Sequence, residues 1–531
     1  MTHEQPSPNL LRQRQLVDAL CTRGGLPPRS KIEETHISWV LLAGCDAYKI
    51  KKAVDLGFLD FSTLEARHFY CTEELRLNRR LAPDLYLNVV AIGGSPEQPL
   101  LGSEPAIEYA VHMRRFPRSA IMDDLLADGQ ITTAHIDKLA ATIAHFHAAL
   151  PPAAADSPHC SIDTIQTAML ENFAQLAALL DAPDDLALLE KMRQASLLEF
   201  TAGEPLFRQR AADGCVRECH ADLHLGNIVL LDDTPVPFDG IEFSEVLRWI
   251  DVISEIAFTV MDLLQRGHPE LAWRFLNGYL EHTGDYQGVG VLRFYLIYRA
   301  MVRAKVAAIR ANQENATQAQ PELTACSNYL DLAHDCLARH HPALILTHGL
   351  PGCGKSTFAQ LALERLGAIR IRSDVERKRL FGMDALADSN SQIGGGIYSE
   401  EATRRTYTHL QELARNLLAA GFPVIIDAAF LRYAERAQLR ALAAELDAPF
   451  VIASVHTDEA VLVERLALRH SRATDASEAD AAVLRALQTA QESLQDEELA
   501  TTVLFVNNGD TDALRADIEK WASLDVRLTC C

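Results

Sequence analysis

The chain has 531 residues, a length that accommodates two or three domains with buried cores. Hydrophobic residues make up 48% and charged residues 23%, which is the composition of a globular protein. The formal net charge of −22 argues against an extended nucleic acid or an anionic membrane as a partner, because a negative field repels phosphates. The 11 cysteines occur without a Cys-x-x-Cys pair, so neither a zinc site nor a disulfide framework is indicated.

The N-terminus and the hydropathy pattern predict a cytoplasmic protein. Residues 1–6 are polar and lack the basic and then apolar pattern of a secretion signal. No uninterrupted apolar run approaches the roughly 20 residues that a membrane-spanning helix needs. We therefore expect a soluble protein in a reducing compartment, with no membrane partner. The sequence leaves the oligomeric state open.

Residues 1–320 are predicted to begin with a small antiparallel sheet and to continue as helices. Strand-forming composition occurs at residues 36–42, 47–52, 87–92 and 107–113. Helical apolar spacing occurs at residues 62–81, 136–150, 170–180 and 186–200. We expect residues 107–113 to form an edge or connecting strand.

The chemistry of this first part concentrates between His220 and Asp239. Asp222 and Asn227 fall in one loop, and Asp239 follows an apolar hairpin. Phosphoryl transfer needs such a set, because one Asp accepts a hydroxyl proton while an Asn and a second Asp hold Mg²⁺. In the alternative interpretation, His220 and His224 are structural histidines and the two aspartates cap turns.

A second motif lies in residues 344–357, where an apolar run breaks into a glycine loop followed by Lys-Ser-Thr. The motif fits a phosphate-binding loop between a strand at 343–346 and a helix at 358–366. Backbone N–H groups and the helix N-terminus would bind a polyphosphate, with Lys355 on the outer phosphates and Ser356 on Mg²⁺. The candidate nucleotide contacts are Gly349, Gly352, Gly354, Lys355, Ser356 and Thr357. The alternative is a glycine turn with no ligand.

Carboxylates follow two predicted strands beyond this loop. Asp374 comes after residues 368–371 and lies near Arg377, a combination that suits deprotonation of a hydroxyl beside an anion. Asp427 ends a buried strand, where P-loop enzymes support Mg²⁺ or substrate. Because a parallel sheet gathers the carboxyl ends of its strands, we expect Asp374 and Asp427 to lie at one edge beside Lys355. We expect a carboxylate to position Arg377 toward the acceptor.

The helix that begins near Glu459 carries three arginines. Arg465, Arg469 and Arg472 recur along it, as they would in a mobile lid over the nucleotide. A solvated basic face is the alternative.

The break between the two parts falls at residues 311–321, where apolar periodicity lapses into amides and small residues. We predict one domain at 1–320, a helical connector at 321–340 and a second domain at 341–531.

The segment from His220 to Asn227, together with Asp239, resembles the catalytic and metal loops of aminoglycoside-phosphotransferase-like kinases, small-molecule relatives of the protein kinases. Over about residues 30–491 the chain is similar to bacterial fusions that join such a domain to a C-terminal P-loop ATP-binding domain. The resemblance implies that Asp222 is the catalytic base and that Asn227 and Asp239 are metal ligands.

The same resemblance implies a lysine on the sheet that contacts the nucleotide and pairs with a helix glutamate. Lys49 and Lys51 are the candidates for the lysine, with Glu74 as the partner. The two lysines lie on one strand face by alternation, so the sequence does not separate them. Asp251 and Glu255 resemble the family's polar support behind the metal loop.

This chain departs from that family's pattern in two places. Ala221 stands where a glycine is common between the His and the Asp. A glycine-rich loop that covers the nucleotide is also not evident in the usual form.

The spacing from Asp374 to Arg377, with Asp427 after a buried strand, resembles the kinase module of polynucleotide kinases and zeta-toxin-like P-loop kinases. The resemblance implies that Asp374 is a base, that Arg377 contacts the acceptor and that the lid arginines neutralise the transferring phosphoryl group.

The predicted fold class combines α+β and α/β. A bilobal protein-kinase-like fold, with a small antiparallel sheet and a helical lobe, precedes a P-loop fold with a parallel sheet. The predicted function is that of an ATP-dependent, Mg²⁺-dependent phosphotransferase acting on a hydroxyl of a small molecule or a nucleotide-like acceptor. The alternatives are an ATP-gated regulator that needs no base, and a fusion with one active and one degenerate kinase domain.

Overall fold

The protein is described by a computed structural model, which covers residues 8–22, 26–27, 30–57, 59–313, 316–338, 341–389, 391, 395–472 and 476–529. Contacts divide the chain into two compact units, of which the first comprises residues 1–167 and 207–262 and the second residues 168–206 and 263–531. This division groups residues by contact. The functional boundaries at residues 320 and 341 stay a prediction.

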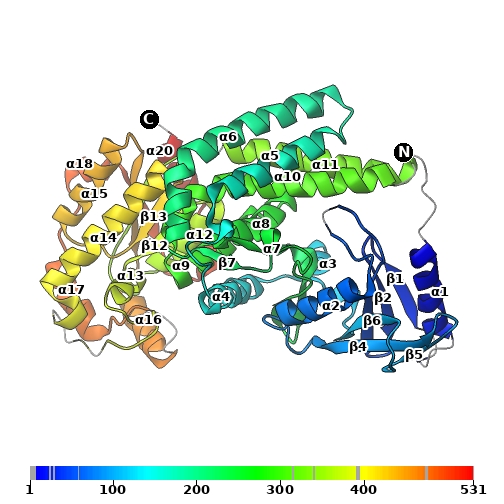
Figure 1. Cartoon of the computed structure of the whole chain (residues 1–531). Coiled ribbons are helices and arrows are strands. Elements are labelled where there is room, and N and C mark those ends of the chain that lie inside the picture. The colour runs from blue at the N-terminus through cyan, green and yellow to red at the C-terminus, as the bar shows by residue number, and fades with distance from the viewer. Residues whose placement is uncertain are drawn as a thin grey trace. The chain divides into compact units, whose positions relative to one another are not determined.

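The first unit contains a six-stranded antiparallel sheet (Figure 1). Its strands are β1 (Lys31–Glu34), β2 (Ser38–Ala43), β3 (Asp46–Lys51), β4 (Tyr86–Ser95), β5 (Gln98–Leu101) and β6 (Glu108–Arg114). Their order is β1-β2-β3-β6-β4-β5, and neighbours run antiparallel. The small antiparallel sheet that the sequence predicts is therefore confirmed.

One expectation about this sheet is wrong, because β6 is an interior strand and not an edge. It pairs with β3 on one side and with β4 on the other. Ala110 belongs to the core on one face of the sheet and Val111 to the core on the other face. A strand with apolar residues toward both faces belongs inside a sheet that is covered on both sides.

Helices α1 (Pro8–Thr22) and α2 (Leu64–Asn78) cover the two faces of this sheet (Figure 1). Leu16, Val17 and Leu20 of α1 pack against Trp39 on one face. Cys71 of α2 packs on the opposite face. Residue alternation along a strand therefore decides which helix a side chain meets.

The rest of the first part of the chain consists of helices and two small antiparallel pairs, β7–β10 and β8–β9. The bounds are α3 (Met122–Ala127), α4 (Thr133–Ala149), α5 (Ile162–Ala177), α6 (Pro183–Ala212), β7 (Val216–Glu218), β8 (Ile228–Leu231), β9 (Thr234–Pro237), α7 (Glu245–Arg248), β10 (Trp249–Asp251) and α8 (Val252–Gln265). The loop from His220 to Asn227 lies between β7 and β8, and Asp239 follows β9.

The second unit contains a five-stranded parallel sheet in the order β12-β13-β11-β14-β15. Its strands are β11 (Leu344–His348), β12 (Ile369–Arg372), β13 (Val424–Asp427), β14 (Phe450–His456) and β15 (Thr502–Val506). The helices that follow β11 in the chain are α12 (Lys355–Leu366), α13 (Ser373–Leu380), α14 (Glu400–Ala419), α15 (Tyr433–Glu445), α16 (Glu459–Arg472), α17 (Ala481–Ala490), α18 (Asp496–Leu499), α19 (Thr511–Arg515) and α20 (Ile518–Thr529). The P-loop α/β fold that the sequence predicts is confirmed.

Three further helices of this unit precede the parallel sheet: α9 (Pro269–Thr283), α10 (Val289–Gln313) and α11 (Ala316–Ala338). Helix α11 packs along α10. It contains most of the residues of the predicted connector at 321–340. Among the helices within the described ranges, none is long and apolar enough to cross a membrane.

Strand β12 is an edge strand, and a side chain of α9 covers its outer edge. The Oδ1 atom of Asn277 accepts a hydrogen bond from the backbone N–H of Arg370 at 2.7 Å, and its Nδ2 donates to the carbonyl of Ala368 at 2.9 Å. Asn277 is buried. A Cβ at Gly367 would lie 2.9 Å from the Trp273 indole, so a glycine permits this close approach. The amide of Asn277 thus occupies the place of a further strand.

We expect Asn277→Ala to open this edge, because it leaves a buried N–H and a buried carbonyl unpaired at a cost of about 1–3 kcal/mol. Amide hydrogen exchange of the peptide that contains Arg370, followed by mass spectrometry, should accelerate about tenfold or more. Asn312→Ala, at an exposed position of α10, is the matched control and should change nothing. Unaltered exchange at Arg370 in a folded Asn277→Ala protein would contradict this account of the edge.

Candidate functional site

Two of the predicted site residues lie on the face of β3 that α2 covers. Ile50 belongs to the core under α1, whereas Ala47 belongs to the core under α2, so the odd-numbered residues of β3 face α2. The Nζ atom of Lys49 lies 2.8 Å from Oε1 of Glu74, and that of Lys51 lies 2.7 Å from Oε2. The structure therefore brings both candidate lysines to the candidate glutamate.

The two lysines differ in their second partner. Lys49 also forms an ion pair with Asp239, at 2.5 Å, and the carboxylate of Asp239 is 43% exposed. Lys51 is fully buried, pairs with Glu242 and lies 5.0 Å from the ring centroid of Phe61. Lys49 is consequently the lysine on the open side of this network, and Lys51 is enclosed by protein.

Charge pairing keeps this network ionised despite its burial. Burial alone would raise the pKa of Glu74, but Lys49 and Lys51 outweigh it and lower that pKa to about 2. Burial likewise opposes the charge of Lys51, whose pKa is nevertheless raised by Glu242 and Glu74. The pairs of Glu74 with the two lysines therefore persist throughout the neutral pH range, whereas burial raises the pKa of Glu242.

The loop after β7 holds a carboxylate and an amide together. The Nδ2 atom of Asn227 donates to Oδ2 of Asp222 at 2.8 Å and to the carbonyl of Asp222 at 3.0 Å. His224 caps the following turn, since its Nδ1 accepts from the N–H of Gly226 at 3.1 Å, and its Nε2 lies 3.5 Å from Asp222 Oδ2. The hydrogen bond from Asn227 therefore fixes the orientation of the Asp222 carboxylate.

His220 connects this loop to the segment before Asp239. Its Nδ1 accepts from the N–H of Asp222 at 3.3 Å, and its Nε2 donates to the carbonyl of Phe238 at 2.9 Å. These two partners assign the neutral tautomer with the proton on Nε2, and burial lowers the pKa of His220. The geometry favours the structural interpretation of His220.

Ala221 adopts a left-handed backbone conformation with φ of 73°. A glycine takes this conformation without the strain of about 1–2 kcal/mol that a Cβ adds, which explains why glycine is common at the position. Two hydrogen bonds hold the strained peptide, because Glu255 accepts from the N–H of Ala221 at 2.7 Å and from that of His220 at 3.0 Å. The departure from glycine is therefore accommodated in the loop.

Helix α8 supplies this support from behind the loop. Burial alone would raise the pKa of Glu255, but His147, at 3.5 Å, and the hydrogen bond from the N–H of Ala221 lower it to about 2, so the carboxylate stays ionised. Asp262 on the same helix accepts from the N–H of Leu225 at 2.9 Å. Asp251 instead pairs with Arg210 at 2.7 Å and accepts from the N–H of Ile253 at 2.8 Å, at the start of α8.

Sequence reasoning missed the groups that hold Asp239 in place. The hydroxyl of Tyr86 accepts from the N–H of Asp239 at 3.0 Å, and Oδ1 of Asn78 accepts from the N–H of Gly240 at 2.7 Å. Asn78 lies one helical turn after Glu74 on α2, so the spacing of four residues could have indicated it. Nothing in the sequence singles out Tyr86.

An Mg²⁺ ion fits the side chains of this first site. Carboxylate and amide oxygens are the ligands that Mg²⁺ prefers, and Asp239 and Asn227 offer one of each. Asp239 is half-exposed and its backbone is fixed in a left-handed conformation with φ of 62°. The loop thus presents a fixed, accessible carboxylate beside Lys49.

In the second unit, the glycine loop depends on the absence of side chains. Gly349, Gly352 and Gly354 have φ values of 141°, 85° and 96°. A Cβ at Gly349 would lie 2.4 Å from the carbonyl of Val455, and one at Gly354 would lie 1.9 Å from Nδ2 of Asn507. The loop therefore passes too close to β14 and to the residues after β15 for any residue but glycine.

Side chains after these two strands also hold the loop. The carbonyl of Cys353 accepts from Nδ2 of Asn507 at 2.9 Å and from Oγ1 of Thr457 at 3.0 Å. Lys355 donates to the carbonyl of Leu350 at 3.0 Å, and Ser356 and Thr357 follow in the first turn of α12. The N–H groups of Gly349 and Cys353 donate to the carbonyls of Ala429 and Leu350. The N-terminus of α12, directly after the loop, is the part suited to bind an anion.

The carboxyl ends of three adjacent strands meet beside this loop. Strand β13 lies between β12 and β11, and Arg372 on β12 is in register with Asp427 on β13. Asp374, two residues after Arg372, begins α13 at the same sheet edge. The topology therefore gathers Asp374, Asp427 and the loop at one edge, as the parallel fold requires.

An Mg²⁺ ion fits Asp427. This residue is buried, and among the described residues its Oδ2 atom has no hydrogen-bond partner. Nε of Arg372 lies 3.8 Å from it, beyond hydrogen-bond distance. A buried carboxylate oxygen without a hydrogen bond is uncommon in a folded protein, and a metal ion would satisfy it.

Arg377 is held differently from what we expected. Its Nη1 donates to the carbonyl of Ile397 at 2.8 Å and to Oγ1 of Thr403 at 3.3 Å. Its guanidinium lies 5.1 Å from the ring centroid of Tyr398. A carbonyl, a hydroxyl and a ring thus stand in place of the expected carboxylate. Within the described part of the chain, Nε of this buried arginine has no hydrogen-bond partner.

Of the three lid arginines, the structure describes the side chain of Arg465 alone; those of Arg469 and Arg472 lie outside the described residues. Arg465 donates through Nη2 to the carbonyl of Gly509, at 2.5 Å. Its Nη1 is buried without a partner among the described residues, and a Cβ at Gly354 would lie 3.8 Å from it. An unpaired guanidinium nitrogen beside the glycine loop suits an anionic ligand.

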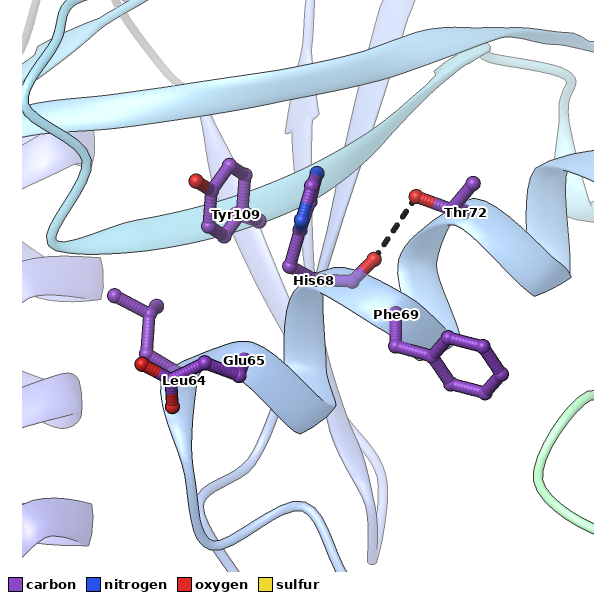
Figure 2. A pocket seen from close by; sticks show the side chains of 6 residues that line it. All are labelled: Leu64, Glu65, His68, Phe69, Thr72 and Tyr109. Atoms are coloured by element: carbon purple, nitrogen blue, oxygen red, sulfur yellow. Dashed lines mark hydrogen bonds between the residues drawn. The ribbon is translucent and has the colours of Figure 1, made fainter.

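A pocket of about 340 Å³ lies beside the first turns of α2, next to β6 (Figure 2). Its lining residues come from α2 and β6 and are Leu64, Glu65, His68, Phe69, Thr72 and Tyr109. The rings of His68 and Tyr109 stack with centroids 4.1 Å apart. The candidate residues of the first site are absent from this lining, and the buried Glu74 is on another face of the helix.

Comparison with known proteins supports the second site. Residues 344–494 match the family model described as AAA domain. This range contains the glycine loop, Asp374, Asp427 and Arg465. The P-loop domain implies that this part of the chain binds a nucleotide.

Two solved structures resemble parts of the chain. The GDP complex of wild-type aminoglycoside 2'-phosphotransferase-IIIa is 13% identical with a TM-score of 0.37, and the match covers 62% of this chain and 99% of that chain. A gluconokinase from Sinorhizobium meliloti 1021 is 21% identical with a TM-score of 0.26, over 36% of this chain and 97% of that chain. These TM-scores are too low to carry a conclusion about function.

The chain is also similar over most of its length to Uncharacterized protein Rv2004c of Mycobacterium tuberculosis (strain ATCC 25618 / H37Rv) and Uncharacterized protein Mb2027c of Mycobacterium bovis (strain ATCC BAA-935 / AF2122/97). The identity is 32% over 469 residues in each case, covering 87% of this chain and 90% of the relative. A match over 87% of this chain includes residues of both compact units. The chain belongs to the same protein family as these mycobacterial proteins.

Proposed function

We propose that the chain is an ATP-dependent, Mg²⁺-dependent phosphotransferase with two nucleotide sites. Each site would transfer the γ-phosphoryl group to a hydroxyl of a small molecule or a nucleotide-like acceptor. The observation that carries the proposal is that each unit has the same three kinds of group. The first unit has Lys49 paired with Asp239, and Asp222 in the loop after β7. The second unit has Lys355, Asp427 and Asp374 at the carboxyl edge of the parallel sheet. A binding protein without catalysis would need the first two groups but no base.

In the first site, Lys49 is assigned to the nucleotide phosphates, and Lys51 to the support of Glu74. The contact of Lys49 with the half-exposed Asp239 supports this assignment, as does the full burial of Lys51. Asp222 is assigned as the base that orients the acceptor hydroxyl and accepts its proton. The hydrogen bond from Asn227 holds the Asp222 carboxylate for that task.

Asn227 and Asp239 are assigned as the metal ligands of this site. When bound, Mg²⁺ supplies positive charge that stabilises the phosphates during transfer. The protein's part is to fix the two ligands: Tyr86 holds the backbone of Asp239, and Glu255 holds the loop that leads to Asn227.

In the second site, the glycine loop and Lys355 are assigned to the phosphates, and Ser356 and Asp427 to Mg²⁺. The unsatisfied oxygen of Asp427 supports its role. Arg465, whose Nη1 lies near Gly354, is assigned to the phosphates, and the assignment extends to Arg469 and Arg472 by position on α16.

The acceptor side of the second site is assigned to Asp374 and Arg377. Asp374 begins α13 at the carboxyl edge of the sheet and is the candidate base. Arg377 faces Tyr398, and its Nε has no hydrogen-bond partner among the described residues, which supports contact with an acceptor. The chemistry of the site does not name the acceptor, because a fold hosts many acceptors.

The assigned roles predict different defects for two substitutions in the first site. Asp222→Asn should keep ATP affinity within about twofold and reduce phosphoryl transfer by about 10²-fold or more, because it removes the base alone. Asp239→Asn should weaken Mg²⁺-dependent ATP binding itself, because it removes a metal ligand. Calorimetric titration and single-turnover transfer on the intact chain separate the two. If both variants lost ATP binding equally while remaining folded, the assignment would be wrong.

Lys355→Ala should abolish ATP binding at the second site and leave the fold unchanged, because the lysine contributes a point charge and is not part of the core. Titration of the intact chain with Mg²⁺ and an ATP analogue should show one binding event fewer than the wild type. Lys191→Ala, at an exposed position of α6, is the matched control. Unchanged affinity and stoichiometry in Lys355→Ala would refute the assignment of the glycine loop.

A further inference from the structure

A carboxylate of α9 binds two arginines of the edge strand β12. Oε2 of Glu281 lies 2.8 Å from Nη2 of Arg370, and Oε1 lies 2.8 Å from Nη1 of Arg372. Residues 370 and 372 alternate along the strand, so both side chains leave it on the same face. Burial alone would raise the pKa of Glu281, but the two arginines lower it, and the carboxylate stays ionised.

Arg372 approaches a second carboxylate, that of Asp427. Its Nε lies 3.8 Å from Oδ2 of Asp427, which is beyond hydrogen-bond distance. The two residues are paired in the strand register, and the Arg372 side chain is 17% exposed. A guanidinium this close to a buried carboxylate commonly closes to a direct hydrogen bond of about 2.7–2.9 Å. Here the bond from Arg372 to Glu281 holds the guanidinium short of that contact.

We propose that Glu281 is a positioning residue for the second site, and that it acts by keeping Arg372 away from full pairing with Asp427. The unpaired Oδ2 of Asp427 is then available to Mg²⁺. This inference rests on the proposed role of Asp427 as a metal ligand and adds a contribution from α9, a helix that lies outside the matched P-loop domain and within the predicted domain at 1–320.

The reason is a competition for one carboxylate oxygen. Without the negative charge of Glu281, Arg372 loses an ion pair at 2.8 Å, and the carboxylate of Asp427 in the next strand, at 3.8 Å, is an anion that its guanidinium can approach. A charge-assisted hydrogen bond there is worth about 1.5–3 kcal/mol, and Mg²⁺ must displace it before binding. The concentration of Mg²⁺ needed for ATP binding should therefore rise about ten- to a hundredfold.

The strand also provides a matched control. Arg370 binds the same carboxylate through a hydrogen bond of equal length, but among the described residues it forms no ion pair with Asp427. Arg370→Met removes one partner of Glu281 and leaves the pair of Glu281 with Arg372 in place. Its Mg²⁺ requirement should stay near that of the wild type.

The test measures ATP binding by the intact chain as a function of Mg²⁺ concentration, counting only the binding that Lys355→Ala removes. Glu281→Gln should raise the half-saturating Mg²⁺ concentration about tenfold or more and leave ATP affinity at saturating Mg²⁺ within about twofold. Adding Arg372→Met to Glu281→Gln should restore the wild-type requirement, because the competing cation is gone. A merely structural role of Glu281 would not produce this rescue.

Two results would overturn the inference. One is an unchanged Mg²⁺ requirement in Glu281→Gln, and the other is a double variant that needs as much Mg²⁺ as Glu281→Gln alone. Wild-type protein without any ATP binding that depends on Lys355 would instead refute the proposed function of the second site, and this inference with it. Thermal unfolding of each variant, without nucleotide, shows whether a change in binding reflects a loss of fold.

Discussion

The first unit depends on one buried carboxylate, Glu74, and on the two lysines that neutralise it. An isolated charge in a protein interior costs several kcal/mol, so each of these groups is stable only while its partners stay in place. Through them, α2 is bound to strand β3, and Lys49 extends the network to Asp239. The same pairing that makes the burial of Glu74 tolerable also joins Lys49 to the segment that carries Asp239.

In the second unit, the edge strand β12 must likewise have its polar and charged groups paired. Strand β12 would expose its backbone groups and two arginines if α9 did not cover it with Asn277 and Glu281. Because β12 leads directly to Asp374 and is in register with Asp427, whatever holds this strand also holds these two residues beside the glycine loop. A helix outside the matched AAA domain is therefore part of the environment of that site.

Sequence patterns predicted the parts of the fold that local chemistry specifies. The glycine loop was recognisable because its backbone conformations and close approaches exclude every other residue. The loop from His220 to Asn227 was recognisable because its residue types are rare in that order. The choice between Lys49 and Lys51 was not predictable, since both lysines share a strand face and only tertiary contacts with Asp239 and Glu242 separate them. The position of β6 inside the sheet and the contacts of Asn277 and Glu281 were not predictable. They depend on pairing between residues far apart in the sequence, which the local pattern of residue types does not reveal.

The central claim is that one chain carries two separate nucleotide sites, each with its own lysine and metal ligands. The most direct measurement is the number of molecules of a non-hydrolysable ATP analogue bound per chain at saturating Mg²⁺, determined by equilibrium dialysis. The account predicts two per chain. A value of one per chain, in protein that is fully folded, would contradict it.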